Sequence, residues 1–144
     1  MIKSTMNNNI KLKTQSQAVV HFIEQLDIEM VDTLLDDTLE YQDMDKDIFI
    51  NKLGHAFNEF IESGDTCLNS TKGFCDSVIC NYKCMGLSFV GNNSGNYMDL
   101  IIEIKDGKVA DMYECTYFKT KVDTEIKNKR VEIDKMIKWK PDSF

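Results

Sequence analysis

Apolar residues in the first half of the chain recur about every three or four positions, the spacing of one face of an α-helix. One such stripe begins near Ser16, and a second follows Asp27, a residue type that commonly caps a helix N-terminus. Two helices and one bent helix are both compatible with these two stripes. A third stripe begins after Asp45 and ends near Ser63, and Gly64 suits the position after a helix C-terminus. The apolar members are Val19, Phe22, Ile23, Leu26, Met30, Val31, Leu34, Leu35, Phe49, Leu53, Ala56, Phe57 and Phe60.

After Gly64 the pattern changes to β-branched and aromatic segments separated by glycines, which predicts strands. The clearest element is a hairpin with strands at 97–104 and 109–118. Its turn is the dipeptide Asp106-Gly107, a strong signal for a two-residue hairpin loop. Such a turn sets the pairing of residues across the two strands. It predicts Ile104 opposite Val109, Ile102 opposite Asp111, Leu100 opposite Tyr113 and Met98 opposite Cys115.

One face of this predicted hairpin is almost entirely apolar and is therefore expected to face the core. Asp111 is the one acid on that face, and Tyr113 and Cys115 follow it there. A buried carboxylate has a raised pKa unless it is paired, so Asp111 is a candidate general acid or base. Alternatively, Asp111 sits beside a bulge, at the rim, or hydrogen-bonded to a tyrosine.

A shorter alternation over 38–43 predicts a short strand ahead of the third helix. It would place Tyr41 and Asp43 on the more apolar face of that strand, directed inward. Helices followed by a run of antiparallel strands indicate an α+β fold. We expect the N-terminal helices to pack on one face of a curved antiparallel sheet.

The chain of 144 residues is long enough for one domain with a single core, and its composition is that of a globular protein. We expect a flexible N-terminal arm at 1–14, the domain at 15–120, and a C-terminal extension at 121–144 that could be a hairpin or a loose helix. The net charge of −7 argues against nucleic acid as a partner, because phosphate binding needs clustered basic residues.

No apolar run approaches the roughly 20 residues that a membrane span needs, so no membrane partner is expected. The polar N-terminus contains no hydrophobic stretch typical of a signal peptide. The simplest localisation is therefore cytoplasmic, a compartment in which thiols stay reduced.

Four of the five cysteines lie close together, at Cys67, Cys75, Cys80 and Cys84. On one straight strand the last two thiols would be about 13 Å apart, too far to share a metal ion. A metal site built from Cys75, Cys80 and Cys84 therefore requires a turn at Asn81-Tyr82-Lys83 or a loop at 73–77, and Zn²⁺ would need a fourth ligand. A labile disulfide is a further alternative. We interpret these residues first as buried free thiols that pack as small apolar side chains.

The order of predicted elements over about residues 16–118 resembles the NTF2-like superfamily, also called SnoaL-like. The resemblance is carried by Leu26-Asp27, by LLDDTLEYQDM at 34–44, by the helix at 46–62 and by YMDLIIEIKDGKVADMYECTYF at 97–118. It implies a cystatin-like cone, with a pocket between the concave face of a strongly curved sheet and the helices. Members include ketosteroid isomerases, dehydratases, polyketide cyclases and many proteins without a known activity, and dimers through the sheet are common.

One position of the superfamily can be carried over to this chain. Several of its enzymes keep a carboxylate at the end of the first strand, often in a Glu-Asp-Pro context. Here Gln42-Asp43-Met44 takes that place, so Asp43 matches the pattern and the proline does not. The missing proline weakens the case for catalysis, because the same aspartate can simply end a strand.

Three hypotheses for the function follow. The first is a non-enzymatic module without a cofactor that binds a small, mostly apolar ligand or a partner in the cone, as a homodimer through the sheet. The second is a cofactor-independent isomerase, dehydratase or cyclase that uses Asp43 and Asp111 with Tyr41 and Tyr113 for proton transfer. The third is a cysteine-based metal or redox protein. Fold similarity alone does not choose among them.

Overall fold

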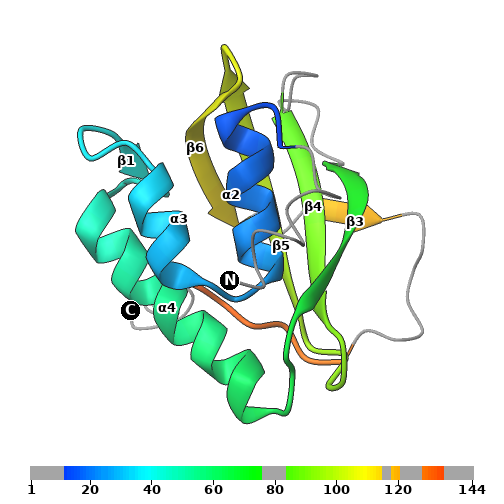
Figure 1. Ribbon diagram of the computed structural model, residues 1–144. Coiled ribbons are helices and arrows are strands. Elements are labelled where there is room, and N and C mark those ends of the chain that lie inside the picture. The colour runs from blue at the N-terminus through cyan, green and yellow to red at the C-terminus, as the bar shows by residue number, and fades with distance from the viewer. Residues whose placement is uncertain (1–11, 76–83, 115–117, 121–127, 135–144) are drawn as a thin grey trace, which may run out of the picture.

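Helices occupy the first half of the chain and an antiparallel sheet the second, as expected for an α+β fold. The computed structural model describes residues 12–75, 84–114, 118–120 and 128–134. Helices α2 (Gln15–Glu24) and α3 (Ile28–Leu34) precede a small hairpin, and helix α4 (Lys46–Glu62) follows it. Figure 1 shows these helices gathered on one side of the sheet.

The helix boundaries confirm the predictions made from the caps. Asp27 caps α3, because its side chain accepts a hydrogen bond from the Met30 N–H over 3.1 Å. Leu26 between α2 and α3 has a φ of 57°, so the two apolar stripes form two helices rather than one bent helix. Asp45 occupies the cap position of α4, although its side chain makes no capping bond. Gly64 follows α4 with a φ of 99°, a conformation that favours glycine.

The predicted strand at 38–43 is instead the first half of a tight hairpin. Strands β1 (Glu40–Tyr41) and β2 (Met44–Asp45) pair antiparallel around the turn Gln42-Asp43. Both turn residues have positive φ, 53° and 61°, as a type I′ turn requires. Asp43 is exposed at the tip of this turn, so its predicted inward orientation is wrong. Tyr41 is fully buried, as expected.

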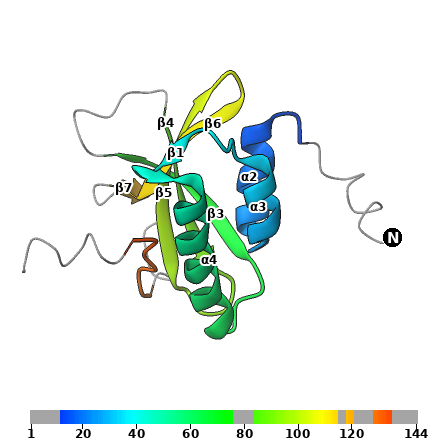
Figure 2. The same ribbon diagram turned by 90° about the vertical axis from the view of Figure 1, so that its left-hand side faces the viewer.

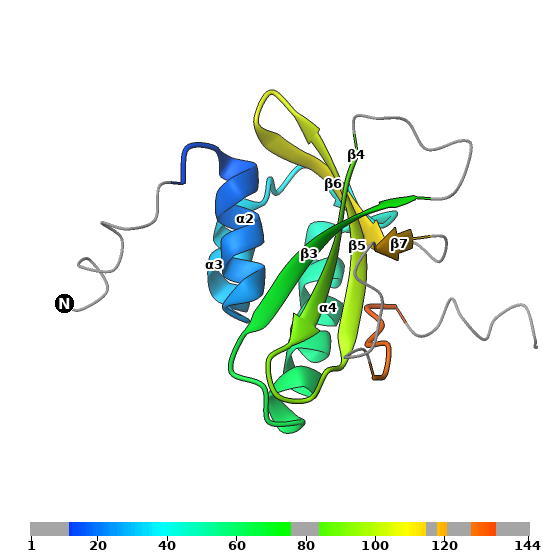
Figure 3. The ribbon, with the colours of Figure 1, turned by 90° about the vertical axis from the view of Figure 1, so that its right-hand side faces the viewer.

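A five-stranded antiparallel sheet has the strand order β6-β5-β4-β3-β7. Its strands are β3 (Leu68–Cys75), β4 (Cys84–Gly91), β5 (Tyr97–Lys105), β6 (Lys108–Glu114) and β7 (Phe118–Thr120). Figures 2 and 3 show from two sides how β3, β4 and β5 cross the helices at an angle. The described strands form an open sheet rather than a closed or strongly curved one, whereas the superfamily resemblance implies strong curvature.

The hairpin of β5 and β6 turns at Asp106-Gly107 as predicted, with φ values of 55° and 78°. A register shift between Glu103 and Ile104 moves the pairing by one residue for every pair further from the turn than Ile104 and Val109. Ile104 does lie opposite Val109, but Glu103 pairs with Asp111, Ile102 with Met112, Ile101 with Tyr113 and Leu100 with Glu114. The predicted pairs of Ile102 with Asp111 and of Leu100 with Tyr113 are therefore wrong. The predicted pair of Met98 with Cys115 lies outside the described residues.

The core lies between the helices and one face of the sheet. Its largest fully buried side chains include Tyr41, Phe49, Phe57, Phe60 and Phe89. Residues 128–134, assigned from the sequence to a C-terminal extension, run along β5 and add two more core residues. Val131 and Ile133 are 1% and 4% exposed, so this segment is part of the folded domain.

Among the helices that the structure describes, none combines the length and the apolar character needed to cross a membrane.

Candidate functional site

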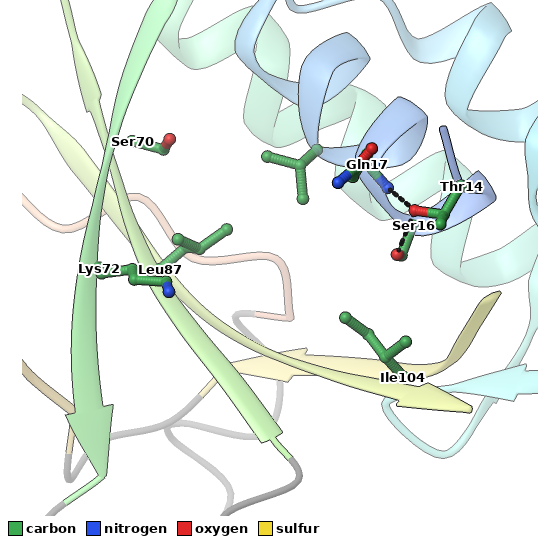
Figure 4. A pocket seen from close by; sticks show the side chains of 8 residues that line it. Thr14, Ser16, Gln17, Ser70, Lys72, Leu87 and Ile104 are labelled. Atoms are coloured by element: carbon green, nitrogen blue, oxygen red, sulfur yellow. Dashed lines mark hydrogen bonds between the residues drawn. The ribbon is translucent and has the colours of Figure 1, made fainter. Parts of the chain in front are cut away.

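A pocket opens between the N-terminal half of α2 and the helix-facing side of the sheet (Figure 4). Its volume is about 450 Å³. Residues of α2 and of its cap form one wall, and β3, β4 and β5 form the other. The lining consists of Thr14, Ser16, Gln17, Val20, Ser70, Lys72, Leu87 and Ile104. We call this space the α2–sheet pocket.

Local sequence explains why α2 begins at this wall. Thr14 caps the helix, since its Oγ1 accepts a hydrogen bond from the Gln17 N–H over 3.2 Å. Gln17 in turn accepts a hydrogen bond at Oε1 from the Lys13 N–H over 2.9 Å. This exchange closely resembles a capping box, in which a threonine and a glutamine three positions later stabilise a helix start together.

The first turn of α2 is also held against the sheet. The Ser16 N–H donates to the Gly107 carbonyl over 2.9 Å. Gln15 Oε1 accepts from the Val109 N–H over 2.8 Å, and Gln15 Nε2 donates to the Leu34 carbonyl over 2.7 Å. One glutamine thus ties α2 to both β6 and the end of α3. The pocket wall is therefore positioned before any ligand binds.

The floor of the pocket is apolar. Val20 from α2, Leu87 from β4 and Ile104 from β5 contribute to it, and Val20 and Ile104 pack against the buried core cluster. Leu87 is itself a core residue, 5% exposed. An apolar molecule in this space would remove these side chains from water, which is favourable in proportion to the apolar area covered.

The β3 side of the pocket is polar, although this strand face points towards the helices. Ser70 lies opposite Phe89, and Lys72 lies opposite Leu87, both partners being buried core residues. Ser70 Oγ donates to Glu24 Oε2 over 2.5 Å, and Glu24 is the last residue of α2. A half-buried serine and an exposed lysine therefore lie on the helix-facing side of β3, where apolar residues are the usual choice.

Tyr41, one of the predicted site residues, has a structural role at its position. It packs against Phe49, with 5.6 Å between the ring centroids, and its hydroxyl accepts from the Asp36 N–H over 3.0 Å. Burial raises the pKa of Tyr41 above its ordinary value, and the charge of Asp36 acts in the same direction. The phenol therefore stays protonated at neutral pH.

Asp111 contacts the β1–β2 turn. Its Oδ1 accepts from the Gln42 N–H over 3.0 Å and from the Met112 N–H over 2.7 Å. Burial raises the pKa of Asp111 above its ordinary value, although these two hydrogen bonds act in the opposite direction. The negative charges of Glu103 and Asp43 raise it further. Asp111 pairs with Glu103, directly beside the register shift, so the alternative prediction that it lies next to a bulge is confirmed.

The four predicted catalytic residues are not all brought together. Asp43 and Asp111 interact electrostatically, and so do Asp111 and Tyr41. Tyr113 instead donates to Glu103 Oε2 over 2.9 Å. Ile102 and Met112 are fully buried in the core, so their neighbours Tyr113 and Glu103 belong to the opposite face of the sheet. None of the four lines the α2–sheet pocket, and their catalytic role stays a prediction.

The cysteines are only partly described. Cys75 ends β3 and Cys84 begins β4, and the two strands are antiparallel neighbours. The side chains of both, together with Cys80 and Cys115, lie outside what the structure describes. Cys67 is a free, half-buried thiol. Over the described ranges, no three His, Cys, Asp or Glu side chains are grouped so that they could hold a metal ion.

A second hollow of about 340 Å³ lies between the start of α3 and the outward side of α4. Its lining is Leu26, Ile28, Ile50, Asn51, Gly54, His55, Phe57, Asn58 and Ile61. Ile61 at this hollow is 49% exposed. The lining contains neither an acid nor a lysine or arginine, which distinguishes it from the α2–sheet pocket.

A buried polar pair occupies the other face of the sheet. Ser88 on β4 lies opposite Asp99 on β5, and the two residues are 0% and 3% exposed. Asp99 Oδ2 lies 3.5 Å from Arg130 Nη2. Ser88 Oγ and Asp99 Oδ1 make no hydrogen bond within the structure described here, so both retain a desolvation penalty.

Reasoning from sequence missed the residues of the α2–sheet pocket. Thr14 falls in the flexible arm expected at 1–14, although the Thr14-x-x-Gln17 spacing is a signal for a helix start. Ser70 and Lys72 fall in a strand whose inward face has no recognisable pattern. These two residues line a pocket only because α2 packs across that strand, and this contact joins residues that are far apart in the sequence.

Comparisons of the chain with protein-family models, with curated proteins and with solved structures found no match.

Proposed function

We propose that this protein is a non-enzymatic module that binds a small, mostly apolar molecule in the α2–sheet pocket. The observation that carries this proposal is the lining: an apolar floor of Val20, Leu87 and Ile104 beside polar side chains from α2 and β3. Sites for small molecules combine a mostly apolar concave surface with a few polar groups that fix orientation.

The size and the rigidity of the pocket support the proposal. Small-molecule sites commonly enclose about 300–1,000 Å³. The α2–sheet pocket, at about 450 Å³, falls within that range. The hydrogen bonds of Gln15 and Ser16 hold its helical wall against β6 and the β5–β6 turn. A wall that is already in place reduces the ordering entropy lost on binding.

The superfamily resemblance supports the same location. NTF2-like proteins bind ligands between their sheet and their helices, and the α2–sheet pocket lies between these two layers. We keep membership of that superfamily, with its homodimer through the sheet, as part of the proposal. Light scattering of the purified chain tests the dimer, and a monomer at all accessible concentrations would contradict it.

A substitution that fills the pocket tests the binding function. Val20→Phe places a larger apolar side chain in the floor, so we expect it to weaken binding of 1-octanol by about tenfold or more through steric exclusion. Binding is followed by titration of the isotope-labelled protein with 1-octanol, using NMR shifts of residues in the lining.

Ile61→Phe is the matched control, because it adds the same ring at the second hollow, where the side chain is 49% exposed. It should leave 1-octanol binding unchanged. The proposal fails if Val20→Phe binds 1-octanol like the unmodified protein, or if Ile61→Phe weakens binding equally.

A further inference from the structure

Two side chains of the α2–sheet pocket, Gln17 and Lys72, offer nitrogen hydrogen-bond donors to a ligand. Gln17 Oε1 already accepts from the Lys13 N–H, so the side-chain amide of Gln17 has its Nε2 donor left for other partners. Figure 4 shows the Gln17 side chain reaching from α2 into the space that faces β3. Donors on the walls beside an apolar floor favour a ligand with an acceptor head group.

Lys72 adds a positive charge to the same space. It is the one basic residue in the lining, and no carboxylate among the described residues pairs with its ammonium group. Its cross-strand partner is Leu87, so Lys72 lies on the helix-facing side of β3 beside the apolar floor. A lysine at such a position contributes nothing to the core, whereas it can neutralise the charge of a bound anion.

Glu24, an acid that contacts the lining through Ser70, lies at the opposite end of the pocket. Glu24 is the C-terminal residue of α2 and accepts the hydrogen bond from Ser70. From Ser70, β3 runs antiparallel to α2 (Figure 1), so Lys72 lies further towards the helix N-terminus. The positive end of the helix dipole, Lys72 and the Gln17 amide thus lie towards the N-terminal end of α2, away from Glu24.

We infer that the ligand of the α2–sheet pocket is an amphiphile with a singly charged anionic head, of the class of medium-chain carboxylates. The carboxylate binds Lys72 Nζ and Gln17 Nε2, and the hydrocarbon body covers Val20, Leu87 and Ile104. A single cation matches a single negative charge, which favours a carboxylate over a doubly charged phosphate monoester. This inference rests on the proposed binding function of the pocket.

Three probes of equal chain length test the head group on the full chain. Octanoate, 1-octanol and octylamine share one hydrocarbon body and differ in charge. We expect octanoate to bind at least about tenfold more tightly than either of the others, because a charge-assisted hydrogen bond contributes more than a neutral one. Increasing the salt concentration should weaken octanoate binding and leave 1-octanol binding unchanged.

Lys72→Gln removes the charge while keeping a hydrogen-bonding side chain at an exposed position. It should abolish the preference for octanoate, a loss of about tenfold in octanoate affinity. Lys129→Gln makes the same charge change at an exposed site outside the pocket and should leave all three affinities unchanged. Thermal unfolding of both variants checks that the fold is retained.

The outcomes separate the two proposals. Equal affinity for octanoate and 1-octanol, or tighter binding of octylamine, overturns the anionic head group and leaves the binding pocket standing. An octanoate preference that survives in Lys72→Gln also overturns the assignment of the head group. Absence of binding by all three probes contradicts the proposed function itself.

Discussion

At the scale of single residues, Asp111 joins the sheet to the β1–β2 turn through a hydrogen bond, but its negative charge is unfavourable at this position. Burial, together with the charges of Glu103 and Asp43, raises its pKa above the ordinary value of 3.8. The folded protein therefore holds this proton more tightly than the unfolded chain does. The contribution of Asp111 to stability is fully present below the unfolded pKa and is lost as pH rises through the folded pKa.

Asp111→Asn is expected to increase the free energy of unfolding at neutral pH. The asparagine oxygen can still accept from the N–H groups of Gln42 and Met112, whereas the buried charge is gone. The gain should shrink as pH falls through the raised folded pKa of Asp111 and should vanish below 3.8, where the unfolded aspartate is also protonated. Urea denaturation of both proteins at neutral and acidic pH measures the difference.

Asp43→Asn is the control for Asp111→Asn, because Asp43 is exposed and adds only a charge interaction. Asp43→Asn should change the free energy of unfolding less than Asp111→Asn does. A loss of stability in Asp111→Asn at neutral pH, or a gain that does not depend on pH, would contradict the argument that ionisation of Asp111 opposes folding.

At the scale of elements, α4 contains one residue that weakens it. Gly54 lies in the middle of this helix, where glycine costs about 1 kcal/mol relative to alanine. A Cβ at Gly54 would meet Ile28 Cγ1 at 3.5 Å, an ordinary contact. Gly54→Ala is therefore expected to stabilise the protein by about 0.5–1 kcal/mol, measured by urea denaturation.

Gly91→Ala provides the opposite case in the same experiment. A Cβ at Gly91 would lie 2.0 Å from Asp65 Oδ2, and Asp65 accepts hydrogen bonds from the N–H groups of Asn93 and Ser94. Displacing this carboxylate removes the hydrogen bonds that hold the loop between β4 and β5. We therefore expect the free energy of unfolding to fall by about 2 kcal/mol or more. Equal effects of the two substitutions would refute this steric argument.

At the scale of the whole molecule, Glu114 joins three separate parts of the chain. Its Oε1 accepts from the Ile133 N–H over 2.8 Å. Its Oε2 accepts from the Asp134 N–H over 3.2 Å and from Gln42 Nε2 over 2.9 Å. The sheet, the β1–β2 turn and the C-terminal segment 128–134 therefore meet at one carboxylate.

Glu114→Ala is expected to destabilise the protein by about 2–3 kcal/mol, because it leaves partly buried N–H groups without their acceptor. Amide hydrogen exchange at Val131 and Ile133 should accelerate more than exchange in α4, since the segment loses its attachment. Glu62→Ala, an exposed glutamate at the end of α4, is the control. Unchanged exchange at Ile133 would mean that Glu114 does not hold the segment.

The sequence alone predicts those features of this protein that depend on neighbouring residues. Asp27 and Gly64 mark helix ends because caps act within one helical turn, and Asp106-Gly107 marks a hairpin because only a few residue types accept its positive φ values. The apolar stripes predict the helical segments, although not whether the first two form one bent helix, and the alternating segments predict the antiparallel sheet. The α+β class follows from such local preferences taken together.

The tertiary structure alone decides the features that depend on pairing between distant residues. A register shift at Glu103 separates Asp111 from the predicted core face, since one extra residue in a strand changes which side chains share a face. Lys72 becomes a candidate ligand-binding residue only because α2 lies across β3. Local preferences do not encode such long-range contacts, because the free energy that selects them comes from packing the whole core.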